Sequence, residues 1–159
     1  MTVIVRPAAS ADAPLIHAFI HELADYERLA REAKATEADV RAALFVANPR
    51  AFCDIVELDG EPVGFALWFY NLSTFEGRHG IYLEDLFVRP GARGRGAGLA
   101  LLKRLARRCR DEGLARLEWS VLDWNAPAIA FYDRLGATTQ AEWLKRRLSG
   151  EALARLAEP

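Results

Sequence analysis

The chain has 159 residues, of which 52% are hydrophobic and 27% charged, and a formal net charge of −1. This composition is that of an ordinary globular protein, and the near-zero charge argues against a general polyanion-binding protein. The two cysteines are too few for a disulfide framework, and no apolar run approaches the roughly 20 residues that span a bilayer. We therefore expect a cytoplasmic protein with no membrane partner.

The first half of the chain predicts strands alternating with amphipathic helices. We expect a strand at 3–6, a helix capped by Ser10 and carrying apolar residues to Leu23, a short helix from a capping box at 36–39 to Asn48-Pro49, and strands at 52–58 and 63–70 joined by an Asp59-Gly60 hairpin turn.

The second half continues in the same way. We expect a strand at 80–88, a glycine-rich turn, a helix ending near Gly113, a strand at 117–121, a helix at 126–135, a last strand at 138–148 and a short helix after Ser149. No linker or repeat interrupts this order, so residues 1–159 are predicted to form one α/β domain.

Residues 83–98 carry the strongest chemical signal, because an apolar strand ends there in a turn with glycines at 91, 94, 96 and 98 and a helix follows at once. Such a turn directs backbone N–H groups and the positive end of a helix dipole at one point, which suits a pyrophosphate. A dinucleotide fingerprint would need glycine where Leu99 stands, and a Walker loop would need lysine where Ala97 stands. What remains is the pattern Arg/Gln-x-x-Gly-x-Gly/Ala over residues 93–98.

Basic residues are concentrated around this turn. Residues 89–110 contain eight Arg or Lys and no acid. A solvated helix face accounts for most of the basic residues from Lys103 to Arg110. A nucleic-acid interface would be expected to interleave aromatic residues with the basic ones, and none do so here, so no nucleic-acid partner is expected.

With this turn, the chain resembles the GCN5-related N-acetyltransferase (GNAT) superfamily. Within it, the chain is similar to the diamine (spermidine/spermine) and thialysine N-acetyltransferase group. The group-specific similarity lies in the Tyr-Leu-Glu-Asp block at 82–85 and the Asp-Trp-Asn block at 123–125. The resemblance implies a single-domain fold with a mixed, mostly antiparallel sheet flanked by helices, acetyl-CoA as co-substrate, and a homodimer.

The resemblance also implies roles for individual residues. Glu84 aligns with the general base that takes a proton from the ammonium, and Tyr132 with the general acid that protonates the leaving thiolate; a phenol suits this because it keeps its proton at pH 7. Asp85 would face the other side of a regular strand. Residues implied in acetyl-CoA binding are Phe87, Val88, Arg93, Gly94, Arg95, Gly96, Ala97, Gly98 and Asn125.

The acceptor is less defined by the sequence. Tyr26, Glu27, Glu84 and Trp143 match positions that line the amine pocket in the group, and carboxylates with aromatic faces suit a cationic amine. We expect a small primary amine, either a diamine or polyamine or a thialysine- or lysine-like compound. Acetylation of a peptide N-terminus or a protein lysine is the alternative, and a non-catalytic acyl-CoA sensor is disfavoured by the presence of Glu84 and Tyr132.

Two other chemistries are less favoured by the sequence. Cys53 and Cys109 stand at core-like positions with no histidine near them in sequence, which argues against a covalent route. His17 and His21 stand at i and i+4 with no third ligand evident, so no metal cofactor is expected.

Overall fold

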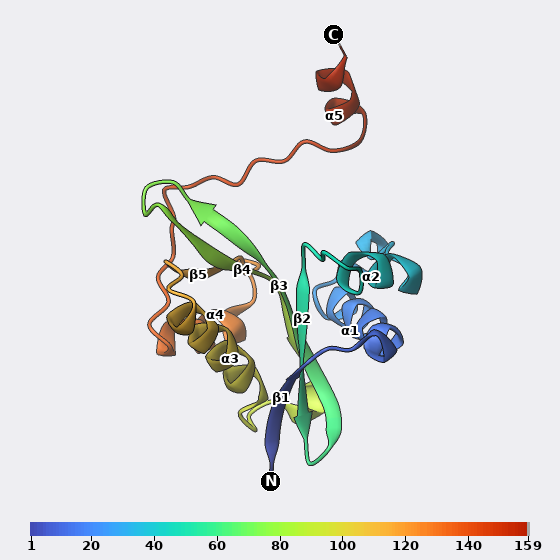
Figure 1. The fold of residues 1–159 in the computed structure, drawn as a ribbon, viewed down its shortest axis with the longest axis vertical. Helices are drawn as coiled ribbons and strands as arrows, with labels where there is room; N and C mark the ends of the chain where they lie inside the picture. The colour runs from blue at the N-terminus through green and yellow to red at the C-terminus, as the bar shows by residue number, and fades with distance from the viewer. Residues whose placement is uncertain (159) are drawn as a thin grey trace. The chain divides into compact units, whose positions relative to one another are not determined.

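The computed structural model describes residues 1–158, which cluster into two compact units, one from Met1 to Leu122 and one from Asp123 onward. The first unit contains a five-stranded sheet of order β1-β2-β3-β4-β5 (Figure 1). Its strands are β1 (Val3–Pro7), β2 (Phe52–Leu58), β3 (Glu61–Ser73), β4 (Arg78–Val88) and β5 (Leu117–Trp119). The first four are antiparallel and β5 runs parallel to β4. The expected mixed, mostly antiparallel sheet is therefore confirmed.

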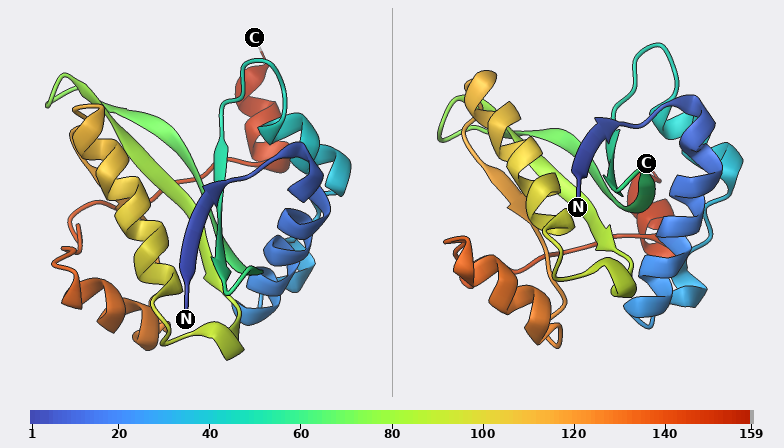
Figure 2. Two further views of the ribbon diagram at one scale, coloured as in Figure 1. Left: turned by 60° about the horizontal axis from the view of Figure 1, so that its bottom comes forward. Right: turned by 90° about the horizontal axis from the view of Figure 1, so that it is seen from below.

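Helices cover both faces of this sheet, with α1 (Ala13–Tyr26) and α2 (Glu37–Leu44) on one face and α3 (Ala97–Asp111) on the other (Figures 1 and 2). On the α1 face the ring of Phe19 stacks on that of Phe65 at 5.6 Å between centroids, and Ile16 and Ile55 are fully buried beside them. Burial of such side chains stabilises the fold by about 1.5–3 kcal/mol each.

The α3 face contains a buried acid. Asp54 is only 3% exposed, and its carboxylate accepts a hydrogen bond of 2.9 Å from the indole N–H of Trp68 and lies 3.5 Å from Nε of Arg104. A carboxylate in such a place is tolerated because it has these partners. The two faces alternate along β2, since Cys53 and Ile55 belong to the α1 core while Asp54 between them pairs with groups from β3 and α3.

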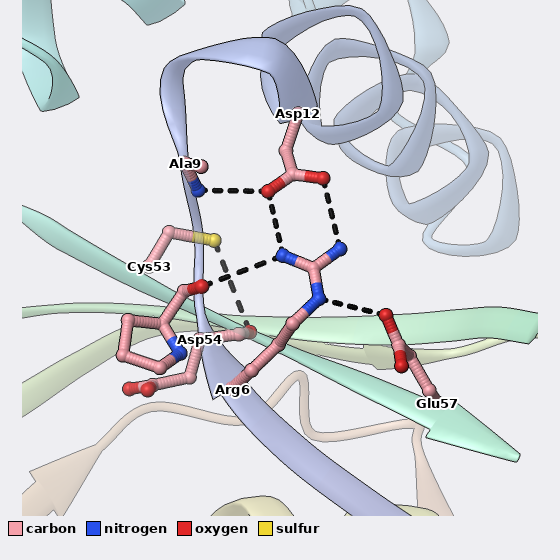
Figure 3. A network of polar contacts seen from close by, with 7 residues as sticks. Arg6, Ala9, Asp12, Cys53, Asp54 and Glu57 are labelled. Atoms are coloured by element: carbon pink, nitrogen blue, oxygen red, sulfur yellow. Dashed lines mark hydrogen bonds and ion pairs between the residues drawn. The ribbon is translucent and has the colours of Figure 1, made fainter. Parts of the chain in front are cut away.

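Arg6 ties β1 to α1 and β2 (Figure 3). Its guanidinium donates two hydrogen bonds to the Asp12 carboxylate, at 2.7 and 2.9 Å, and one of 2.7 Å to Glu57. The Asp12 carboxylate also accepts a hydrogen bond from the Ala9 N–H. The chain enters α1 through a 3-10 turn at Ser10–Asp12, and Ser10 lies within this turn. The prediction that Ser10 caps the helix is therefore wrong.

Local signals predicted several other boundaries. Thr36 caps α2 in a capping box with Asp39, and Asp59 and Gly60 form the expected hairpin turn with φ of +52° and +87°. Helix α2 ends at Leu44, before the expected Asn48-Pro49.

The second unit contains α4 (Ala126–Arg134) and α5 (Gly150–Ala157). The expected helices after Asn125 and Ser149 are present, but the last strand predicted at 138–148 is wrong. This stretch is exposed, and no strand pairs with it in the part of the chain that the structure describes. A strand needs a neighbour for its backbone N–H and C=O groups, so a strand-like pattern alone does not produce one. None of the helices in residues 1–158 combines the length and apolar content needed to cross a bilayer.

Candidate active site

The turn between β4 and α3 is built for a close approach of backbone to a ligand. Gly94 and Gly96 have φ of +73° and +84°, which residues with a Cβ rarely adopt. A Cβ added at Gly91, Gly94 or Gly96 would meet no atom within 4 Å. Glycine is therefore favoured at 94 and 96 by the positive φ of the backbone, and not because neighbouring atoms leave no room for a side chain.

The N-terminus of α3 opens directly from this turn. Gly96 is the residue before the first helical turn and has no side chain to accept the first N–H groups of the helix. These groups have no partner within a helix, and they lie at the positive end of the dipole of a 15-residue helix. The residues Ala97 and Gly98 therefore present N–H groups suited to a phosphate, as the sequence pattern indicates.

The two arginines of the turn point to different parts of the first unit. Arg93 donates from Nε to the carbonyl of Val88 at 2.9 Å, and its guanidinium carbon lies 4.3 Å from the centre of the Tyr26 ring. Arg95 contacts Met1 Sδ at 3.3 Å and Asp59 at 3.6 Å. Arg93 thus connects the predicted cofactor turn directly with a residue predicted to line the amine pocket.

Asp85, on the strand that leads into this turn, lies within range of two other acidic charges. The pKa of Asp85 is raised to about 7 by burial, then by the negative charges of Glu84 and Glu27. Burial also raises the pKa of Glu27, which directly follows the last residue of α1. Asp85 therefore lies within range of the charges of both Glu84 and Glu27, the two acids that the sequence assigns to an amine pocket. A buried carboxyl whose ionisation is opposed by burial and by neighbouring negative charges is a favourable site for a cation.

Asp85 was missed at the sequence level because β4 is not a regular strand. Trp68 of β3 pairs with Leu83, while the preceding Leu67 pairs with Asp85, so Glu84 is an extra residue in a β-bulge. A bulge interrupts the two-residue alternation on which the assignment of opposite faces to Glu84 and Asp85 depended. The sequence signal that could have indicated Asp85 is the pair of adjacent acids, Glu84 and Asp85, in a strand.

The end of β4 leaves one backbone edge for a ligand. β5 pairs with β4 only at Ile81, Tyr82 and Leu83, so within residues 1–158 no strand lies beside that edge from Glu84 to Val88. Unpaired strand edges bind extended chains through backbone hydrogen bonds. This agrees with the role that the resemblance implies for the backbone of Phe87 and Val88, whereas the side chain of Phe87 is buried in the core.

Gly64 of β3 maintains the geometry of this strand end. A Cβ on Gly64 would lie 2.3 Å from the carbonyl oxygen of Phe87 and 3.0 Å from the Cα of Val88. Both atoms belong to the backbone and cannot rotate away, so glycine is required for β3 to approach β4 here. The role of Gly64 was not predicted from the sequence.

The remaining predicted site residues belong to the second unit. Asn125 is 7% exposed and caps α4, with its Oδ1 accepting the Ala128 N–H at 3.3 Å. Tyr132 is half-buried on α4, with its ring 5.4 Å from that of Phe131. Trp143 is 73% exposed. No group of three or more His, Cys, Asp or Glu side chains arranged for a metal occurs in residues 1–158.

Comparison with known proteins identifies the family. The sequence of residues 16–137 matches the acetyltransferase (GNAT) family, and this range includes β4, the glycine turn and α4. The chain belongs to the GNAT acetyltransferase family. The acetyltransferase fold accounts for the phosphate-suited turn at the end of a central strand.

Two relatives of this GNAT chain are small-molecule acetyltransferases by name. It is 40% identical to thialysine N-epsilon-acetyltransferase of Sus scrofa, over 98% of both chains, and 30% identical to L-ornithine N5-acetyltransferase of Arabidopsis thaliana, over 94% of this chain and 85% of the relative. The resemblance to the thialysine group is thereby confirmed.

Solved structures share the fold. An integron cassette protein from the mobile metagenome of V. cholerae superposes with a TM-score of 0.83 and 27% identity, over 100% of this chain and 99% of that one. An aminoglycoside acetyltransferase from an uncultured soil sample has a TM-score of 0.76 at 19% identity, over 94% and 100% of the respective chains, which shows the fold alone.

Proposed function

We propose that this GNAT enzyme transfers the acetyl group of acetyl-CoA directly to a primary amine of a small cationic substrate of the thialysine, lysine, ornithine or diamine type. The observation that carries the proposal is the buried Asp85 carboxyl, whose ionisation is opposed by the charges of Glu84 and Glu27, on the strand that leads into the phosphate-suited turn. A cationic amine would relieve their mutual repulsion. The names of the thialysine and ornithine relatives agree with such an acceptor.

The donor would be held by the backbone. The N–H groups at Gly94, Gly96, Ala97 and Gly98 would bind the pyrophosphate of acetyl-CoA, and the free edge of β4 at Phe87 and Val88 would bind the pantetheine arm and polarise the thioester carbonyl. In this proposal the charges of Arg93 and Arg95 add to the attraction for the anion. Asn125 would support the same arm while capping α4.

Transfer would require a neutral amine. Glu84, directly or through one water, would take a proton from the ammonium, and the amine nitrogen would then attack the thioester carbon. The carbon–sulfur bond would then break, and the leaving CoA thiolate would take a proton from the hydroxyl of Tyr132. The second proton, which the nitrogen releases as the amide forms, would return to Tyr132 through water. Tyr26, Glu27 and Trp143 would contact the amine substrate, with Asp85 as an additional negative charge.

A route through an acetylated cysteine is disfavoured by the state of both thiols. Burial, then the charge of Asp54, raises the pKa of Cys53, and burial likewise raises that of Cys109. A thiol is a good nucleophile only as the thiolate, which a raised pKa depletes at neutral pH. Direct transfer in a ternary complex is therefore proposed.

The domain organisation, location and oligomeric state of the enzyme are proposed on the basis of its family. We propose that residues 1–159 work as one acetyltransferase domain, which the family match across both compact units supports. The two free cysteines agree with the reducing cytoplasm. No catalytic metal, membrane or nucleic acid has a part in the proposed reaction, and a homodimer is proposed from the resemblance.

A screen of acceptors tests this function. Consumption of acetyl-CoA is measured with thialysine, lysine, ornithine, diamines, spermidine and lysine peptides, and we expect the highest kcat/KM with a small amine.

Replacing Tyr132 by Phe should lower kcat at least tenfold while acetyl-CoA affinity, measured by calorimetry, changes little. Replacing Glu84 by Gln should move the activity optimum to higher pH. Preference for peptides, or no binding of acetyl-CoA by the wild-type protein, would contradict the proposal.

A further inference from the structure

Two histidines on α1 converge on the chain that leads into α2. His17 and His21 are one helical turn apart and half-buried, and their ring centroids are 4.5 Å apart. Their Nε2 atoms lie 3.1 Å from each other, and Nε2 of His17 lies 3.0 Å from the carbonyl oxygen of Ala35. Ala35 is exposed, so this point is open to solvent. Nε2 of His17 thus lies within 3.1 Å of two other electron-pair donors.

Protons alone satisfy this arrangement poorly. If Nε2 of His17 carries a proton and donates to Ala35, it has no lone pair to accept a hydrogen bond from His21. If instead it accepts from Nε2–H of His21, its lone pair faces the lone pairs of the Ala35 carbonyl. With neutral rings, both contacts are hydrogen-bonded only if the single proton on Nε2 of His17 is shared between Ala35 and His21, which is a weaker three-centre arrangement. A cation placed among the donors would satisfy all three together.

The spacing of the donors matches the ligand shell of a transition metal. If each ligand atom lies about 2.1 Å from one ion, the separations of 3.0 Å from His17 to Ala35 and 3.1 Å from His17 to His21 subtend angles of about 90–95° at the ion. Right angles belong to tetragonal and octahedral coordination, which Cu²⁺ and Ni²⁺ adopt with nitrogen and oxygen ligands, rather than to the tetrahedral shell of structural Zn²⁺.

We propose that His17, His21 and the Ala35 carbonyl form a binding site for a divalent first-row transition-metal ion, with water completing its coordination. Cu²⁺ should bind most tightly, followed by Ni²⁺, as the general order of stability of such complexes requires. The sequence alone shows two ligands at i and i+4, and the structure adds the carbonyl as the third. The ion would join α1 to the residue preceding the cap of α2, and it has no part in acetyl transfer.

Calorimetric titration with NiCl2 tests the site without any assay of activity. Wild type should bind one equivalent of Ni²⁺, and the ion should raise the melting temperature because the paired imidazoles exist only in the folded helix. Replacing either His17 or His21 by Gln should weaken Ni²⁺ binding roughly a hundredfold, since the second ligand no longer binds intramolecularly. A parallel titration with CuCl2 should give the tighter complex.

His79, the third histidine of the chain, provides the matched control. His79→Gln should bind Ni²⁺ as wild type does, and circular dichroism of each variant should show unchanged helix content. The site is refuted if wild type binds no Ni²⁺ at millimolar concentration, or if the His17 and His21 variants retain wild-type affinity. Because the readout is metal binding, its failure leaves the proposed acetyl transfer standing, and the reverse also holds.

Discussion

Asp85 contributes a pH dependence to the stability of the protein. In the native state its pKa is about 7, because of burial and then the charges of Glu84 and Glu27, whereas in the unfolded chain it should be near 4. The native state therefore holds more protons between pH 4 and 7, and the free energy of unfolding falls as the pH rises through this window. Above pH 7 the loss is complete.

Replacing Asp85 by Asn should remove this dependence. Between pH 5 and pH 8 the wild type should lose about 2–3 kcal/mol of unfolding free energy that the variant does not lose. The native pKa of about 7 lies two units above pH 5, and each unit corresponds to about 1.4 kcal/mol. Urea unfolding at both pH values measures the difference, and comparing each protein with itself cancels the cost of the substitution. An equal pH dependence in both proteins would show that Asp85 ionises normally in the native state.

Arg93 should affect binding of the amine, and not only binding of the phosphates of acetyl-CoA. Its guanidinium lies on Tyr26, a contact worth about 0.5–1 kcal/mol, so replacing Arg93 by Gln should raise the KM for the amine about two- to fivefold. Arg95→Gln is the matched control, because Arg95 belongs to the same turn but contacts Met1 and Asp59. Steady-state kinetics with each substrate varied separates the effects. If Arg93→Gln raises only the KM for acetyl-CoA, the contact with Tyr26 has no functional role.

Among individual residues, the sequence predicted those whose role depends on local chemistry. Gly94 and Gly96 were found because a turn with positive φ has few alternatives to glycine. Asp85 and Gly64 were missed because their roles depend on β3 lying against β4, with a bulge at Glu84 and a close backbone contact at Phe87. Neither the bulge nor the contact leaves a periodic trace in the sequence.

The elements of the first unit are held together by the Arg6 network as well as by the apolar core. Arg6 lies between Asp12 and Glu57, which come from the entry to α1 and from β2 (Figure 3). The hydrogen bonds from Arg6 hold the pKa of Asp12 below its usual value. The stability that Asp12 provides is therefore present above the ordinary carboxyl pKa near 4 and is lost as the pH falls through the lower native value.

Replacing Asp12 by Asn should destabilise the protein by about 1–3 kcal/mol at pH 7, because a hydrogen-bonded, partly buried ion pair and the bond to Ala9 are weakened together. Thermal unfolding at pH 7 measures this loss. Glu37→Gln is the control, since Glu37 forms an exposed pair with Arg41 within α2, which should be worth less than 1 kcal/mol. Equal effects of the two substitutions would show that the Arg6 network adds nothing beyond a surface pair.

Whole elements were predictable where their signals are local. The Asp59-Gly60 turn and the Thr36 capping box need only neighbouring residues, and both are present as expected. The strand expected at 138–148 would need a partner edge from elsewhere, and in the described residues this stretch pairs with none. Local chemistry was therefore sufficient to predict this turn and this cap, while pairing decides whether an extended stretch becomes a strand.

At the scale of the molecule, the second unit exposes large apolar side chains near the end of the chain. Trp143, Leu144, Leu148, Leu153 and Leu156 are 51–81% exposed. Leu153 and Leu156 stand three residues apart on α5 and therefore share one face of that helix. Clustered exposed apolar residues are unfavourable in water and are typical of surfaces that bind another protein. A second copy of the chain, the homodimer that the resemblance implies, would provide such a partner.

This arrangement predicts the oligomeric state. In sedimentation experiments at micromolar concentration the wild type should have twice the mass of one chain, and replacing both Leu153 and Leu156 by Glu should shift it to the monomer. Charged side chains would then have to be buried in the interface without partners, at a cost of several kcal/mol. Val46→Glu is the control, as Val46 is 49% exposed in the first unit and should leave the dimer intact. A monomeric wild type, or a dimer that survives the double substitution, would exclude this face of α5 as the interface.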